Sequence, residues 1–427
     1  MVTPQLGSRL TVFGEPWSVA EELGRGGEGA VYAVHDGSDR RRFALKWYFS
    51  PADWRRDLLA YLVDRGSPTD RFLWPLAIIE ARDGTFGYVM HLRPDGYASL
   101  ADLLRGRVER REDRVLRFGL DLASSFLALH GAGLCYRDIN FGNAFYDPTN
   151  GRALICDNDN VGIDGVSRSG VRGAPQFMAP EIVREETLPS RVTDQHSLAV
   201  MLYYLLMVGH PLEGGRTWNV VADGDAHRRF FGVEPLFAFD PDDHRNRPDP
   251  ISEAHVIERW ERLPSSLRNL FLRAFTVGLH DPELRVQDSE WCRSLRDASA
   301  RLWRCQRCGR DSYAEHGRTV CGGCGTAMPG WVKVNGSELA ISELLEVTRA
   351  HVGPDGDDLR PVGIAEAHPG RAGVIGLRNA TAESWHAVDP VAGPQVVPPG
   401  RRVRLLPGTT VDIGGVPLGV YGTWAGT

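Results

Sequence analysis

The stretch Tyr136-Arg137-Asp138-Ile139-Asn140-Phe141-Gly142-Asn143 decides how the rest of this chain is interpreted. An acid, Asp138, is followed five residues later by an amide, Asn143, and fourteen residues after that by a second acid, Asp157. Carboxylate and amide oxygens are ligands that Mg²⁺ accepts, and a further carboxylate can orient a hydroxyl that attacks a phosphate. The spacing suggests phosphoryl transfer, although Asp and Asn are also common in turns.

The length and composition predict a soluble protein of two or three domains. A chain of 427 residues exceeds what one core usually supports, and 42% apolar with 24% charged residues is typical of globular proteins. A net charge of −6 gives no electrostatic indication of nucleic-acid or membrane binding. The most apolar run, Leu198 to Val208, is too short to cross a bilayer, and Met1 to Gly14 lacks the pattern of a signal peptide. We therefore expect a cytoplasmic protein that binds neither nucleic acid nor membrane.

Apolar periodicity divides the chain into a mostly β part and a mostly helical part. Before residue 99 it predicts three antiparallel strands over 17–47, a helix from Pro51 to Val63, and two further strands, 72–79 and 85–91. The later helices are predicted to end at Gly131 and to cover 193–208, 265–276 and 289–302. After Met328 short strand-like runs follow one another, so we place domain boundaries near 303 and 330.

A glycine motif and a lysine precede the opening stretch. Gly24, Gly26 and Gly29 form G-x-G-x-x-G between two predicted strands, which favours a hairpin over phosphates rather than a dinucleotide fold. Glycine permits close approach to phosphate oxygens and positive φ angles. Strand alternation places Lys46 and the small Ala44 on the same face as this hairpin. A flexible hairpin and a solvated lysine are the alternative interpretation.

With the glycine motif, Lys46, Asp138, Asn143 and Asp157 in this order, the chain resembles the eukaryotic-like bacterial Ser/Thr protein kinases over residues 12–302. The resemblance implies an α+β fold of two lobes, about 12–90 and 94–302. It extends to motifs beyond the active site. These are Met178-Ala179-Pro180-Glu181, Asp194, and Arg285 as the expected partner of Glu181.

The resemblance implies a role for each matched residue. Asp138 would orient the substrate hydroxyl and accept its proton, while Asn143 and Asp157 would coordinate Mg²⁺. Lys46 would hold the α- and β-phosphates of ATP. The implied ATP site consists of Gly24, Gly26, Gly29, Val31, Ala44, Lys46, Met90 and Phe145, with His91 to Arg93 as the hinge.

The chain departs from the family pattern at several active-site positions. Asn140 stands where these kinases usually carry a lysine, and Ala174 stands where they usually carry a threonine. One less cation near the transferring phosphoryl group predicts a lower rate. The Asp-Phe-Gly triplet is replaced by Asp157-Asn158-Asp159, which puts a polar residue where an aromatic one normally packs.

No glutamate occurs between Lys46 and Gly66. The ion pair that such kinases form with the lysine would therefore be made by Asp57 or Asp53, or be absent.

Two alternatives to a protein kinase remain. A pseudokinase that binds ATP as a scaffold would explain the altered triplet, and a small-molecule kinase would explain Asn140 with Asp-x-Asp. The segment from Gly173 to Glu181 favours a protein substrate. Ser167 and Ser169 are candidate autophosphorylation sites or merely solvated loop residues.

Four of the seven cysteines form two C-x-x-C pairs separated by twelve residues. Tetrahedral zinc accepts four thiolates, and a glycine next to each pair permits a tight turn, so we predict a structural zinc ribbon over 303–330. A redox pair is the alternative. The predicted zinc ligands are Cys305, Cys308, Cys321 and Cys324. The isolated cysteines are interpreted as core thiols and are Cys135, Cys156 and Cys292.

Residues 331–427 loosely resemble forkhead-associated domains and predict a small β-sandwich. Such domains bind phosphothreonine, and Thr348-Arg349-Ala350-His351 is a faint match to their binding turn. A docking module or an appendage that completes a core is the alternative. The whole architecture resembles kinases that work beside a von Willebrand factor A protein and a metal-dependent phosphatase, which are the partners this resemblance implies.

Overall fold

The described chain forms two compact units in a computed structural model. The first unit comprises Met1–Trp260 and Asn269–Arg293, and the second comprises Glu261–Arg268 and Ser294–Thr427. The described residues are 3–38, 41–50, 52–81, 83–166, 173–218, 220, 223–315, 319–353, 358–371 and 373–422. Ser167 and Ser169 lie outside these ranges. The finer division at 303 and 330 stays a prediction.

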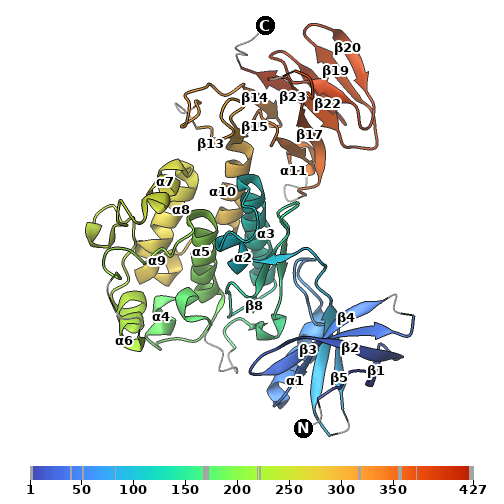
Figure 1. Ribbon diagram of the computed structural model, residues 1–427, viewed down its shortest axis with the longest axis vertical. Helices are drawn as coiled ribbons and strands as arrows, with labels where there is room; N and C mark the ends of the chain where they lie inside the picture. Colours follow the sequence, from blue (N-terminus) through green and yellow to red (C-terminus); the bar gives the residue numbers. More distant parts are fainter. Residues whose placement is uncertain are drawn as a thin grey trace. The chain divides into compact units, whose positions relative to one another are not determined.

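The first unit begins with an antiparallel sheet in the order β1-β2-β3-β4-β6-β5 (Figure 1). Its elements are β1 Arg9–Val12, β2 Glu15–Arg25, β3 Gly29–Asp36, β4 Arg42–Tyr48, α1 Asp53–Arg65, β5 Ala77–Glu80 and β6 Phe86–His91. Alternation along β4 decides which residues face the site. Leu45 and Trp47 enter one core cluster, whereas Ala44 and Tyr48 enter another on the opposite face.

Helices build the remainder of the first unit and continue into the second. They are α2 Leu100–Leu104, α3 Glu112–Gly131, α4 Pro180–Val183, α5 Arg191–Met207, α6 Gly224–His227, α7 Ala254–Arg262, α8 Ser265–Phe275, α9 Val277–His280 and α10 Asp288–Arg301. Short strands frame the active-site loops. They are β7 Ala98–Ser99, β8 Leu134–Cys135, β9 Ala144–Tyr146, β10 Ala153–Ile155 and β11 Gly162–Ile163. Within the described residues, no helix is both long and apolar enough to cross a membrane.

Most predicted elements are present, and the differences include the following three. The predicted strand 72–79 is wrong in its first half, because only Ala77–Glu80 joins the sheet and Phe72 forms an isolated bridge to Ile155. The first strand, β1, was not predicted. Helix α7 was also not predicted, because the proline-rich sequence before it indicated an irregular segment.

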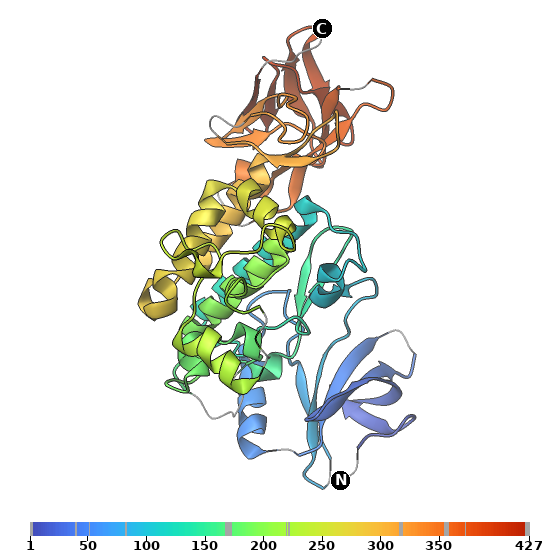
Figure 2. The same cartoon turned by 60° about the vertical axis from the view of Figure 1, so that its left-hand side comes forward.

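The second unit combines a small hairpin with a two-sheet β structure, drawn in orange and red in Figure 2. One sheet has the order β15-β14-β23-β22-β19-β20 and the other β16-β17-β18-β21. Residues of both sheets, such as Val332 and Leu377, share one buried cluster. The elements are β12 Leu302–Arg304, β13 Asp311–Tyr313, β14 Trp331–Val334, β15 Ser337–Ala340, β16 Glu346–Thr348, α11 Arg349–Val352, β17 Pro361–Ala367, β18 Ile375–Asn379, β19 Trp385–Asp389, β20 Gly393–Val397, β21 Arg402–Arg404, β22 Thr410–Ile413 and β23 Val416–Tyr421.

Candidate active site

The glycine motif forms the hairpin turn between β2 and β3, where the Gly26 N–H donates to the Gly29 carbonyl at 2.9 Å. The expected positive φ angles are wrong for Gly24, Gly26 and Gly29, none of which is left-handed. A Cβ on Gly29 would lie 2.3 Å from the Trp47 carbonyl oxygen, so packing requires this glycine. A Cβ on Gly24 or Gly26 would meet nothing within 4 Å. The space beside these two glycines is therefore not filled by other parts of the described chain.

The residues predicted to surround adenine lie in one apolar cluster between sheet and loop. Ala44 and Met90 are buried in this cluster, and Val31 and Phe145 pack against it. The Arg93 guanidinium lies 4.0 Å from the centre of the Phe145 ring. The structure thus brings the four predicted side chains together from β3, β4, β6 and β9.

The opening stretch of the sequence is anchored from beneath by buried charges. Asp194, at the start of α5, accepts the backbone N–H groups of Tyr136 and Arg137 at 2.5 and 2.9 Å. His130 lies between this carboxylate, 3.3 Å away, and Asp288, 2.6 Å away. Burial alone would lower the pKa of His130, but hydrogen bonds and negative charge from the two acids raise it to about 9. The loop is therefore fixed by a charged network.

Asp138 and Asn143 contact one another directly. The Asn143 amide donates to the Asp138 carbonyl at 3.0 Å and to its carboxylate at 3.2 Å. Asn160 donates to the same carboxylate at 3.3 Å. Burial raises the pKa of Asp138, and the nearby Asp157 charge adds to this, against hydrogen bonds from Asn140 and Asn143. A carboxylate with a raised pKa is better suited to accept a proton near neutral pH.

The two departures beside Asp138 supply hydrogen bonds without charge. Asn140 donates its amide to the Asp138 carbonyl at 3.1 Å and accepts the Gly142 N–H at 2.8 Å. Ala174 contributes a backbone hydrogen bond that stabilises the ionised Asp138. These hydrogen bonds maintain the loop geometry. Asn140 is neutral, however, and does not replace the positive charge of the lysine expected at this position.

Asp157 lies beside Asn143 because the β9–β10 hairpin pairs their segments. The Cys156 N–H donates to the Asn143 carbonyl at 2.9 Å, next to the paired residues Ala144 and Ile155. Asp157 adopts a left-handed conformation, with φ 51°, and its side chain remains 42% exposed. Burial of its carboxyl, together with the Asp159 charge, raises the pKa of Asp157 against the attraction of Lys46. An accessible carboxylate beside an amide fits the ligand preference of Mg²⁺.

Lys46 forms its closest ion pair with Asp159, which the sequence analysis missed. The ammonium lies 2.9 Å from the Asp159 carboxylate and 3.5 Å from that of Asp157. Among the described residues, neither Asp53 nor Asp57 makes this pair. A sequence signal existed, because an acid at the third position of the triplet coincided with the absence of glutamate after Lys46.

Asn158, the polar replacement in the triplet, is fully buried. Its amide donates to the Ile155 carbonyl at 3.1 Å, whereas its Oδ1 atom has no hydrogen-bond partner. The predicted loss of an aromatic packing residue is therefore real, and a polar side chain occupies a dry position at some energetic cost.

The predicted partnership of Glu181 and Arg285 is confirmed. Both terminal nitrogens of the Arg285 guanidinium donate to the Glu181 carboxylate at 2.7 Å, and both side chains are nearly inaccessible to solvent. Arg285 also donates to the carbonyls of Val192 and Gly278, at 3.0 and 3.1 Å. This pair ties the segment after the active site to α5 and α9.

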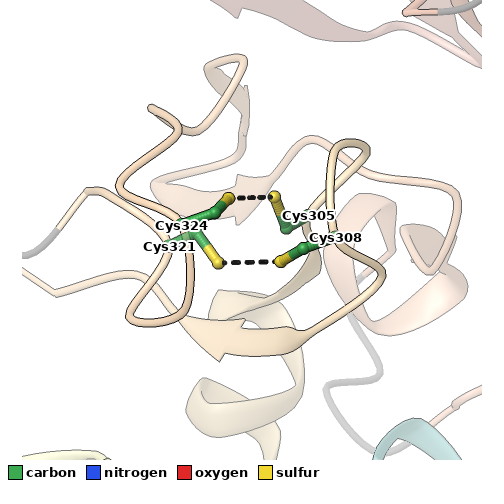
Figure 3. A group of neighbouring side chains, drawn as sticks. All are labelled: Cys305, Cys308, Cys321 and Cys324. Atoms are coloured by element: carbon green, nitrogen blue, oxygen red, sulfur yellow. Dashed lines mark hydrogen bonds between the residues drawn. The ribbon is translucent and has the colours of Figure 1, made fainter.

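The four predicted zinc ligands converge in the second unit, with all Sγ atoms within 4.8 Å of one another (Figure 3). Cys305 faces Cys324 and Cys308 faces Cys321, each at 3.5 Å. Thiolates at about 2.3 Å from a tetrahedral zinc ion would be roughly 3.8 Å apart, so the cluster is compatible with zinc.

Matching turns support the two halves of this cysteine cluster. Gly309 and Gly325 have left-handed φ angles of 71° and 70° and donate N–H groups to the Cys305 and Cys321 carbonyls. Hydrogen bonds from Thr326 lower the pKa of Cys324 to about 6. Glycine is therefore required by conformation here, as the sequence predicted.

Comparison with known proteins gives matches along the described active site. The model of the protein kinase domain family matches residues 82–295. Protein kinase YegI of Escherichia coli K12 is 25% identical over 343 residues, which cover 74% of this chain and 49% of YegI. Serine/threonine-protein kinase SRK2C of Arabidopsis thaliana is 24% identical over 290 residues, covering 65% of this chain and 74% of SRK2C. Serine/threonine-protein kinase pkn3 of Myxococcus xanthus is 28% identical over 206 residues, covering 44% and 35%. The chain spans about half the length of YegI.

Proposed function

Because this chain belongs to the protein kinase domain family, we propose that it transfers the γ-phosphoryl group of ATP to Ser or Thr hydroxyls of a protein. The observation that carries this proposal is the convergence of Asp138, Asn143 and Asp157 beside Lys46. An inert scaffold has no need to retain all four groups in one place.

Each group has a proposed task that its surroundings support. Asp138 orients the substrate hydroxyl and accepts its proton, for which its raised pKa is suited. Asn143 and Asp157 would hold Mg²⁺, which neutralises phosphate charge when bound with ATP. Lys46 holds phosphate oxygens, while Val31, Ala44, Met90 and Phe145 surround the base. The backbone of three glycines would cover the phosphates; these are Gly24, Gly26 and Gly29.

We propose that transfer is slow compared with that of relatives that carry a lysine at position 140. Asn140 fixes the loop through two hydrogen bonds but brings no positive charge to the phosphoryl group. Loss of one such electrostatic contact lowers rates by about 10²–10³-fold in well-studied enzymes.

The rival proposals are a pseudokinase and a small-molecule kinase. For the first, Asn158 with its unpaired oxygen is the favouring observation, since it removes aromatic packing from the triplet. For the second, Asn140 and the Asp-x-Asp pattern remain. The buried Glu181–Arg285 pair supports machinery for a protein substrate instead.

Transfer of ³²P from labelled ATP with Mg²⁺ tests the proposal. Wild-type protein should phosphorylate itself or a generic protein substrate, and Asp138→Ala and Asp157→Ala should lower the rate by roughly 10²–10⁴-fold. Equal labelling of all three proteins would defeat the catalytic claim. Nucleotide binding without transfer in any of them would support the pseudokinase.

We further propose that the protein substrate carries a basic residue near its acceptor hydroxyl. A cavity of about 710 Å³ lies beside Pro175, at the segment expected to receive the substrate. It is lined by aromatic and acidic side chains. These include Trp218, Phe230, Phe231, Glu213, Asp223 and Glu253. Carboxylates beside aromatic faces attract an arginine or lysine side chain.

A peptide array in which arginine is moved through each position around the acceptor tests this preference. Glu213→Gln with Glu253→Gln should weaken the preference severalfold, and Glu283→Gln, an exposed acid outside the cavity, should leave it unchanged. An arginine preference that survives the double substitution would refute the assignment.

For the second unit, we propose a zinc ribbon at 303–330 and a docking module at 331–427. The cysteine geometry supports the zinc ribbon.

In the proposed docking module, a pocket beside Arg349 is also lined by Asp358, Glu383 and Asp412. This excess of acidic side chains disfavours binding of phosphothreonine. A von Willebrand factor A protein and a metal-dependent phosphatase are proposed as partners from resemblance alone. Co-purification with the chain, and its loss after deletion of 331–427, tests that proposal.

A further inference from the structure

The Asp159 carboxylate is completely enclosed by donors of the chain itself. Its side chain is 1% exposed, and the Lys46 ammonium lies 2.9 Å away. The hydroxyl groups of Tyr48 and Tyr88 donate to it at 2.7 and 3.1 Å. An unpaired buried carboxylate is strongly disfavoured, so this set of donors fixes both the acid and the lysine that it pairs with.

The two acids of the same turn are available to different partners. Asp157 is 42% exposed and lies 3.5 Å from Lys46, so its side chain is accessible to solvent. Asp159 directs its oxygens at protein donors and is closed to solvent. A carboxylate can bind a metal only if its oxygens are accessible. This favours Asp157 as the metal ligand and Asp159 as the partner of the lysine.

The receptor for Asp159 is built from the sheet and not from α1. Lys46 on β4 is paired with Tyr88 on β6, and Tyr48 lies two residues beyond Lys46 on the same face. Both tyrosines belong to the buried cluster on that face. Two adjacent strands thus present three donors to one carboxylate.

Helix α1 contains no glutamate, and it presents the cation of Arg55 instead. The Arg55 guanidinium donates to the Glu28 carboxylate at 2.9 and 3.1 Å, and it lies 4.8 Å from the centre of the Tyr48 ring. Glu28 belongs to the glycine motif. Helix α1 is therefore linked to the glycine hairpin, and Lys46 is linked to the turn after β10.

We propose that Asp159 is the positioning partner of Lys46, in the role that a glutamate of the helix after the lysine strand has in other protein kinases. The alignment of Lys46 then depends on the turn that carries Asp157, so displacement of this one turn would remove the lysine partner and the metal ligand together. The part of this proposal that concerns phosphate binding rests on the proposed function, whereas the ion pair does not.

The chain offers a direct test, because it contains only two lysines, Lys46 and Lys333. Lys333 is 49% exposed and serves as an internal reference. The nucleotide-free protein is treated with an amine-acylating reagent at fixed pH, and the labelling rates of the two lysines are compared by peptide mass spectrometry. Asp159→Asn keeps the shape but removes the charge, and it should raise the ratio of Lys46 to Lys333 labelling about tenfold. An ammonium held by a carboxylate is a poor nucleophile, which is the reason for the rise.

Further variants make the result specific. Asp57→Asn, on α1, should leave the labelling ratio unchanged. Tyr48→Phe removes one donor to Asp159 but retains the carboxylate charge, so the labelling ratio should stay near the wild-type value. Asp159→Ser also removes the charge, and it keeps the test valid if Asp159→Asn fails to fold. Asp138→Asn should abolish transfer without changing the ratio, which separates the ion pair from activity.

The kinetic readout distinguishes positioning from stability. Asp159→Asn should lower kcat and raise KM for ATP while its thermal midpoint in the absence of nucleotide remains above the assay temperature. An unchanged labelling ratio in folded Asp159→Asn or Asp159→Ser, or a rise in Tyr48→Phe as large as that in Asp159→Asn, would overturn the proposal. A raised ratio in a protein that never transfers phosphate would uphold the ion pair and refute the proposed function.

Discussion

The active site of the first unit and the cysteine cluster of the second gather polar side chains in opposite ways. In the active site, buried acids have cations of the chain as partners, such as Asp159 with Lys46 and Glu181 with Arg285. In the cysteine cluster, four sulfur atoms face one another within 4.8 Å. Opposite charges hold the first arrangement together, whereas four thiolates repel unless a cation lies among them.

This difference separates a charge network whose partners are all side chains of the chain from a cluster that we propose is completed by a zinc ion. The active-site framework should break when a side chain is replaced. The cysteine cluster should break when metal is withdrawn. The two regions should also respond oppositely to pH, because one depends on a protonated histidine and the other on deprotonated thiols.

Withdrawal of metal has the largest expected effect. Structural zinc contributes roughly 10 kcal/mol or more to the folding of small domains, so a strong chelator should unfold residues around the cluster. Trp303, 1% exposed beside Cys305 and Cys321, should become accessible to solvent. Zinc content by elemental analysis and tryptophan fluorescence measure the two changes.

Substitution at the cluster provides the matched test. Cys305→Ser with Cys321→Ser should eliminate bound zinc, while Cys292→Ser, at a buried thiol outside the cluster, should retain it. Nucleotide affinity of the first unit should change by less than about twofold in the double variant, since the cluster belongs to a separate compact unit. Unchanged zinc content in the double variant would show that the cluster is not the metal site.

Removal of one partner of a buried pair has the next largest effect. Arg285→Ala leaves Glu181 buried without its cation and should lower the free energy of unfolding of the first unit by about 3–5 kcal/mol. Denaturation monitored by nucleotide binding measures it. Arg245→Ala is the control, because Arg245 is 72% exposed and pairs with Asp243 at the surface. Its loss should leave the free energy of unfolding nearly unchanged. An equal decrease in the free energy of unfolding in the two variants would show that burial of the Glu181–Arg285 pair makes no difference.

The success of sequence reasoning differed between these pairs for a physical reason. Glu181 and Arg285 are 104 residues apart, yet each lies in a motif of recognisable local pattern. The spacing of the four cysteines in two C-x-x-C pairs was enough to predict that they cluster. Asp159 and Lys46 are 113 residues apart, and their contact depends on which face of β4 meets the turn after β10. No local spacing contains that information, and the acid stands where the family pattern has glycine.

The same distinction applies to whole elements. Strong periodicity predicted α5, α8 and α10 within one or two residues, and it predicted the end of α3 at Gly131. Helix α7 was missed because nearby prolines favour irregular structure and the helix, nine residues long, gives a short pattern. The roles of Asp138, Asn143 and Asp157 remain predictions, although the structure places these residues together.

The charged network beneath the catalytic loop predicts a pH dependence with a defined sign. His130 has an ordinary pKa near 6.5 when unfolded and about 9 when folded, so its contribution to stability is complete below pH 6.5. It is lost as pH rises toward 9, and amounts to about 3 kcal/mol. The free energy of unfolding of the first unit, measured from pH 6 to 9.5, should therefore decrease.

His130→Gln should flatten this dependence, because glutamine does not titrate. Zinc affinity of the second unit should change in the opposite direction and weaken as pH falls, since thiolates become protonated. A wild-type unfolding free energy that is constant from pH 6 to 9.5 would show that His130 is not held as an imidazolium between Asp194 and Asp288.

The smallest expected effect concerns the link between α1 and the glycine hairpin. Arg55→Ala removes the contact with Glu28, whose side chain is 54% exposed, so KM for ATP should rise only about two- to fivefold. Arg56→Ala, which breaks a surface pair with Glu80, is the control and should leave KM unchanged. Steady-state kinetics over a range of ATP concentrations measures both.

Labelling of Lys46 in Arg55→Ala distinguishes positioning of the lysine by Asp159 from positioning by α1. If the active-site charges are organised as described, loss of Arg55 loosens the hairpin but leaves the pair between Lys46 and Asp159 intact, and the ratio of Lys46 to Lys333 labelling stays at the wild-type value. A rise equal to that in Asp159→Asn would mean that α1 positions the lysine after all. The position of Asp159 would then follow that of the helix, and the alignment of Lys46 would depend on α1 as the folding of the cysteine cluster is proposed to depend on zinc.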